Sequence, residues 1–116
     1  MKKTASRAKK ADFRAYFSGS RRFSSAAATL SVARVADPEQ PSRFGFVVGA
    51  KAVPLATDRN LLKRRARAIM SGYSDRIRPG MILFFNFKKP AGALTFKGLK
   101  DDLTDLIHRA GILKNV

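Results

Sequence analysis

The chain has 116 residues, enough for one folded domain with a single core. Apolar residues make up 45% of the sequence, which excludes an intrinsically disordered chain. The 24 Lys and Arg face only 8 Asp and Glu, and the formal charge of +16 favours a polyanionic partner. Cysteine is absent, so disulfides and cysteine-based zinc sites are excluded, and we expect a reducing, cytoplasmic setting.

Membrane insertion and export are not expected. No apolar run approaches the ~20 residues that cross a bilayer. The first ten residues are basic, but no apolar segment follows them, so we do not expect them to form a signal peptide. We expect residues 1–10 to be a flexible basic N-terminus on a single domain that spans residues 1–116.

A short helix is predicted next, with Asp12 as its N-cap and Gly19 at its end. Phe13, Tyr16 and Phe17 share one side of it at i, i+3, i+4 spacing. An aromatic stripe of this kind usually packs in a core. The cations around it leave base stacking open as a second interpretation.

Two strands are predicted after this helix, one within residues 23–35 and one over residues 43–49, separated by a proline-containing turn at 37–42. The second strand alternates clearly, and one of its faces carries Phe44, Phe46 and Val48. Gly45 is on the opposite face, where the absence of a side chain leaves room for a close approach.

Residues 57–70 predict a helix with one apolar arc and one cationic arc. An α-helix turns about 100° per residue. The apolar arc then holds Leu55, Leu62, Ala66, Ile69 and Met70. The adjoining arc holds Arg59, Asn60, Lys63, Arg64 and Arg67. Thr57 or Asp58 is the expected N-cap and Gly72 the expected end, while Arg65 lies apart on the far side.

The cationic arc favours a polyanion over a plain solvated surface. Solvated helices usually alternate acids with bases at i,i+4 spacing, whereas the only acid in this stretch is Asp58. Five cations on one helix repel one another, and phosphate groups would relieve that repulsion.

The rest of the chain predicts a turn over residues 76–80, a central strand over 81–87, a loop over 88–92 and a helix over 99–110 that ends at Gly111. Three aspartates are expected early in this last helix. His108 is expected on its surface. The fold class is therefore α+β, a two-layer sandwich in the order α-β-β-α-β-α with a possible extra strand.

These residues resemble the protein component of bacterial ribonuclease P. The resemblance rests on residues 44–51, FGFVVGAK, followed eight residues later by residues 59–67, RNLLKRRAR. Asp12, Phe13 and Phe17 upstream, and Pro79-Gly80 with the last strand and helix downstream, also fall where that family has them. Two positions depart from its motifs. Leu61 replaces an arginine and Ala50 replaces a lysine, so we expect weaker or shifted RNA contacts.

The resemblance implies a ribosomal protein S5 domain 2-like fold with a left-handed β-α-β crossover. It also implies an accessory protein subunit whose RNA partner is the catalyst, so no catalytic residue is expected in this chain. The ribonucleoprotein would remove the 5′ leader of precursor tRNA in the cytoplasm, with one protein monomer in each holoenzyme. The RNA would hold most of the Mg²⁺, and no metal ligand is expected here.

The resemblance assigns roles residue by residue. The expected contacts to the catalytic RNA are Lys51, Arg59, Asn60, Lys63, Arg64 and Arg67, because guanidinium and ammonium groups bind phosphate oxygens. The expected leader contacts are Phe13, Phe17 and Phe46, because stacking tolerates any base. Phe44 and Phe46 could also fill the core.

Two other functions stay open at this point. A nuclease that works without RNA would need converging carboxylates to hold its metal ions, and the acids of this chain are scattered. A non-enzymatic RNA-binding protein of ribosomal type would share the charge and is compatible with the same fold. A helix-turn-helix DNA reader fits less well, because strands flank the basic helix.

Overall fold

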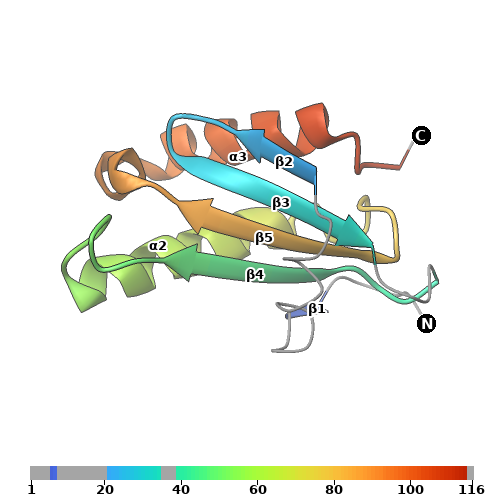
Figure 1. The fold of residues 1–116 in the computed structure, drawn as a ribbon, viewed down its shortest axis with the longest axis horizontal. Coiled ribbons are helices and arrows are strands. Elements are labelled where there is room, and N and C mark those ends of the chain that lie inside the picture. Colours follow the sequence, from blue (N-terminus) through green and yellow to red (C-terminus); the bar gives the residue numbers. More distant parts are fainter. Residues whose placement is uncertain (1–5, 8–20, 35–38, 115–116) are drawn as a thin grey trace.

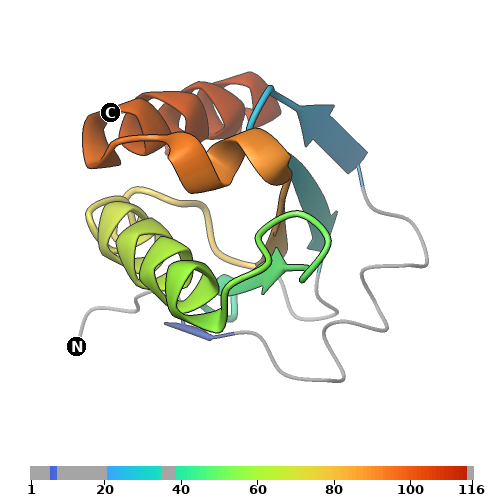
Figure 2. The ribbon, with the colours of Figure 1, turned by 90° about the vertical axis from the view of Figure 1, so that its left-hand side faces the viewer.

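The computed structural model describes residues 6–7, 21–34 and 39–114, which form one sheet with two helices on one of its faces (Figures 1 and 2). The strands are β1 (Ser6–Arg7), β2 (Arg21–Ser24), β3 (Ala28–Arg34), β4 (Arg43–Val48) and β5 (Met81–Phe87). The helices are α2 (Ala56–Ser71), the short 3₁₀ helix η1 (Lys89–Ala93) and α3 (Phe96–Ala110). The predicted α+β sandwich is confirmed, while the predicted helix with Phe13, Tyr16 and Phe17 lies outside the described residues.

The strand order in the sheet is β1-β4-β5-β3-β2. β4 and β5 are parallel neighbours, and β5 is antiparallel to β3 on its other side. The apolar run 81–87 is therefore an interior strand, and residues on both of its faces are buried, as predicted. Seen from the helix side with β4 and β5 pointing up, β5 lies to the left of β4 (Figures 1 and 2), so the crossover through α2 is left-handed. The resemblance implied this handedness, which is rare in proteins.

Residues 23–35 contain the one strand predicted there, β3, and also the end of a second strand, β2, which was not placed in advance. This segment forms the end of β2 and all of β3, which pair as an antiparallel hairpin. The turn was not predicted, because it contains no Gly or Pro, the residues that usually mark turns in a sequence. Its geometry comes from Ser25, whose backbone N–H donates to the carbonyl of Ala28 and whose side-chain oxygen accepts from the amide of Ala28.

The N-terminal segment contributes a short strand that its basic composition did not predict. Ser6 and Arg7 pair in parallel with Arg43 and Phe44, so β1 extends the sheet beyond β4. This pairing fixes the backbone of these two residues beside the strand that leads into α2.

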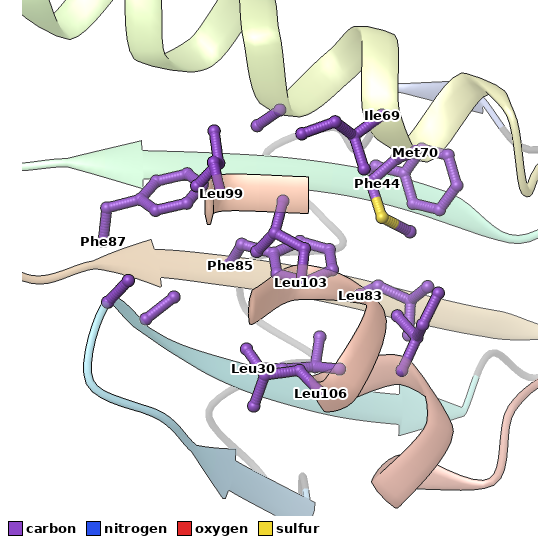
Figure 3. Packing of buried hydrophobic residues seen from close by; sticks show 14 of the residues in the cluster. Leu30, Phe44, Ile69, Met70, Leu83, Phe85, Phe87, Leu99, Leu103 and Leu106 are labelled. Carbon is purple, nitrogen blue, oxygen red and sulfur yellow. The ribbon is translucent and has the colours of Figure 1, made fainter. Parts of the chain in front are cut away.

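The main core lies between the sheet and the two helices (Figure 3). Phe85 of β5 is fully buried at its centre, with Leu103 of α3 and Met70 of α2 packed in the same cluster. On the opposite face of the sheet, a smaller cluster contains Ala33, Ile82 and Phe84. Phe84, Phe85 and Phe87 are thus all core residues, as expected.

The helix ends differ in part from their predictions. α2 begins at Ala56 with Leu55 as its N-cap, without a side-chain cap, so Thr57 and Asp58 lie inside its first turn. Leu55 precedes the helix and is 62% exposed, so its place in the apolar arc was wrong. α3 begins three residues before Leu99 and is capped by Thr95, which moves its aspartates away from the first turn. Gly111 ends α3 in the left-handed region, as predicted.

Candidate nucleic-acid interface

The helix α2 is held against the core by one face and presents the cationic face beside it. Its buried residues are Leu62, Ala66, Ile69 and Met70. Asn60, Arg64 and Arg67 are exposed, whereas Arg59 and Lys63 are half-buried at the border of the two faces. The predicted RNA contacts on this helix therefore form one continuous surface.

The charges of the two helices differ sharply. α2 carries five cations and one acid, whereas α3 carries three cations (two lysines and one arginine) and three aspartates. On α3, Lys97 Nζ lies 2.8 Å from Asp101 Oδ2 and Arg109 Nε lies 2.9 Å from Asp105 Oδ2. The hydrogen bond that Lys97 donates to Asp101 raises the pKa of Lys97. Of these two helices, α2 is therefore the one whose positive charge is not matched by acids.

Arg59 uses part of its donor capacity within the protein. Its Nη1 donates to the backbone carbonyls of Val53, at 2.9 Å, and of Pro54, at 2.8 Å. These contacts leave the hydrogens on Nε and Nη2 for other acceptors. The sequence motif indicated a phosphate contact at this position and carried no signal of the internal role.

Lys51 is exposed on the turn that joins β4 to α2. The amides of Ala52 and Val53 both donate to the carbonyl of Gly49, and this closes the turn. Lys51 therefore lies between the last residue of β4 and the N-terminal end of the cationic helix. Ala50, where the related motif has a lysine, is exposed beside it.

Phe46 lies on the helix-side face of β4, half-buried against the main core. Its ring is stacked with Phe85, at a centroid distance of 5.6 Å, and with Phe87, at 6.3 Å. The guanidinium carbon of Arg67 lies 6.0 Å from the Phe46 ring centroid, within the range of a cation–π contact. Phe46 thus joins the aromatic core to the cationic face of α2, while Phe44 is buried.

The other two predicted leader contacts, Phe13 and Phe17, lie outside the described residues. Leu61, which replaces an arginine of the related motif, is half-buried on α2. His108 is exposed near the end of α3, as expected, with its Nδ1 2.8 Å from the carbonyl of Thr104.

Within the described part of the chain, no group of three or more His, Cys, Asp or Glu side chains is placed to hold a metal ion. The three aspartates of α3 point to other partners. Asp101 and Asp105 pair with Lys97 and Arg109, and Asp102 accepts a hydrogen bond from the hydroxyl of Ser25. No helix among the described residues has the length and apolar character of a membrane span.

Comparison with known proteins supports the resemblance to the ribonuclease P protein family. The sequence matches the family model described as Ribonuclease P over residues 1–111. A protein named "Ribonuclease P protein component" from Clavibacter michiganensis is 29% identical over 86% of this chain and 87% of its own length. The protein of the same name from Phytoplasma australiense is 37% identical, and the match covers 61% of each chain.

Solved structures share the fold. The RNase P protein of Staphylococcus aureus superimposes with a TM-score of 0.81 at 19% identity, covering 97% of this chain and all of that one. The RNase P protein of Thermotoga maritima superimposes with a TM-score of 0.76 at 24% identity, covering 89% of this chain and 96% of that one. At these identities, the likeness establishes the fold alone.

Proposed function

This chain belongs to the ribonuclease P protein family, and from this premise we propose that it is the protein subunit of a ribonucleoprotein that matures tRNA. In this proposal a large RNA is the catalyst. The holoenzyme hydrolyses one phosphodiester bond of precursor tRNA and so releases the 5′ leader. The protein acts in the cytoplasm as one monomer in each holoenzyme.

The observation that carries the proposal is the cationic face of α2. It brings Arg64, Arg67 and Lys63 together on a helix that has only one acid to balance five cations. Arginine side chains on such a face bind phosphate oxygens through two parallel N–H donors, and they stay charged at any physiological pH. We assign this face, with Asn60 and Lys51 at its N-terminal end, to the catalytic RNA.

The chemistry belongs to the RNA in this proposal. The described carboxylates on α3 are engaged with Lys97, Ser25 and Arg109, an arrangement suited to holding the helix in place. Mg²⁺ is therefore assigned to phosphate oxygens of the RNA. The cations of α2 support it by lowering the electrostatic cost of bringing two RNA molecules together.

The leader is assigned to the aromatic residues Phe13, Phe17 and Phe46. Base stacking on aromatic rings does not depend on sequence, which suits an enzyme with many different substrates. For Phe46, the position beside Arg67 supports this role, because a stacked base would have a cation within reach of its phosphate.

Precursor-tRNA cleavage at low Mg²⁺, with the cognate catalytic RNA and with or without the protein, tests this function. We expect the protein to restore accurate 5′ cleavage. The double variant Lys63→Ala with Arg64→Ala should abolish the rescue. The matched control is Lys97→Ala with Lys100→Ala, which removes two charges from α3 and should leave the rescue intact.

Two results would overturn the proposal. Tight, salt-dependent RNA binding without any rescue would make the protein a non-enzymatic RNA-binding protein of ribosomal type. Cleavage by the protein in the absence of catalytic RNA would make it a nuclease in its own right.

A further inference from the structure

Arg59 has the contacts of a residue that shapes the interface from within. It is half-buried, and its Nη1 directs hydrogen bonds to two consecutive backbone carbonyls, those of Val53 and Pro54. The side chain thus reaches back from the first turn of α2 to the segment that enters the helix.

The two carbonyls have no partner within the hydrogen-bond ladder of the helix. The first backbone hydrogen bond of α2 runs from the amide of Arg59 to the carbonyl of Leu55. The carbonyls of Val53 and Pro54 precede that point, so the helix supplies no amide for them. The guanidinium of Arg59 fills this gap with charge-assisted hydrogen bonds, which are stronger than those of neutral donors.

The segment held in this way is the turn that carries Lys51. At its start, the carbonyl of Gly49 accepts from the amides of Ala52 and Val53. At its end, the Val53 side chain is 4% exposed and packs beside Gly92, where an added Cβ would lie 3.4 Å from Val53 Cγ2. Arg59 completes the fixation at the last two residues, so Lys51 projects from a turn that is tied at both ends.

We propose that Arg59 is a positioning residue, which holds the 49–54 turn in place and thereby sets Lys51 against a phosphate of the catalytic RNA. The inference rests on the proposed function, and it assigns Arg59 a role that acts through Lys51. A fixed turn lowers the conformational entropy lost when the lysine binds. Without Arg59, Lys51 keeps its charge but loses its defined place.

The first measurement is amide hydrogen exchange of the free full-length protein. Arg59→Ala should raise the exchange rates of the Ala52 and Val53 amides on the order of tenfold, because the end of the turn is released. Arg64→Ala is the matched control, since it removes the same charge from the same helix. We expect it to leave exchange in the turn unchanged.

The second measurement is a double-mutant cycle in affinity for the catalytic RNA. In the wild type, Lys51→Ala should weaken binding on the order of tenfold, the usual effect of losing one charge-assisted hydrogen bond. In the Arg59→Ala background, Lys51→Ala should reduce the affinity for the RNA by less than about twofold, because the turn no longer holds the lysine in a defined position. In the Arg64→Ala background, Lys51→Ala should reduce the affinity for the RNA as much as it does in the wild type.

The outcomes separate the two proposals. If the wild type does not bind the catalytic RNA, the proposed function fails, whatever the exchange rates show. If the wild type binds and Lys51→Ala costs the same in both arginine backgrounds, only the positioning role is refuted. Unchanged exchange in Arg59→Ala, or no effect of Lys51→Ala in the wild type, also refutes the positioning role.

Discussion

The ring of Phe84 lies directly over Gly45 on the neighbouring strand, on the sheet face opposite α2 and α3. The two residues are register partners in the parallel pair β4–β5. A Cβ built on Gly45 would lie 2.2 Å from Cε1 of Phe84, a distance that real Cβ atoms essentially never show. The close approach expected at Gly45 is therefore made by the protein's own core. The glycine is needed for packing of the sheet.

This contact predicts that Gly45→Ala destabilises the fold by about 1–3 kcal/mol, the usual cost of overpacking a core. Urea unfolding followed by circular dichroism measures the effect. Gly49→Ala is the matched control, because an added Cβ there meets nothing within 4 Å, and we expect little change in its free energy of unfolding. A Gly45→Ala protein as stable as the wild type would show that Phe84 can move aside freely.

The cationic face predicts a defined salt dependence of RNA binding. A plot of the logarithm of the RNA-binding constant against the logarithm of the salt concentration has a negative slope. If Arg64 contacts a phosphate, Arg64→Ala should make this slope shallower by about 0.7–0.9. Lys97→Ala should leave the slope unchanged, since Lys97 lies on α3 beside Asp101. Filter binding at several salt concentrations measures both slopes. Equal slopes for all three proteins would place the RNA on another surface.

Phe46 provides a test that separates a leader contact from a purely structural role. Phe46→Leu should weaken binding of a precursor with a leader on the order of tenfold, as expected for one lost stacking contact. Binding of the same tRNA without its leader should not change. Phe23→Leu is the control, because Phe23 is also a half-buried aromatic packed against the core, but it lies on β2. Equal losses for both tRNAs would assign Phe46 to the core alone.

Leu61 predicts a gain of function. Leu61→Arg restores the arginine of the related motif beside the cationic face, so it should tighten binding to the catalytic RNA. The slope against salt should steepen by about 0.7–0.9 if the new side chain reaches a phosphate. Phe96→Arg adds the same charge on α3, where Phe96 is 44% exposed, and should leave the slope unchanged. Equal steepening in both variants would mean that net charge alone controls binding.

Periodicity predicted those elements whose pattern is local. The 3.6-residue pattern of α2 placed Leu62, Ala66, Ile69 and Met70 in the core correctly. The apolar run of β5 also predicted a strand covered on both faces. The hairpin between β2 and β3 was missed, because its turn depends on one serine side chain. Leu55 was placed wrongly, because helix periodicity does not show where a helix begins.

The sequence by itself determined the cationic character of α2, the α+β class and the motifs of the family, because these depend on residue type and spacing along the chain. Only the tertiary structure decided that Phe84 fills the space above Gly45, that Phe46 lies beneath Arg67, and that Arg59 holds the turn of Lys51. The physical reason is that each of these contacts depends on the position of a partner in three dimensions. That position is set by the register of the strands, by the residue at which a helix begins and by the path of the loops. The spacing of residues along the chain does not encode these three features.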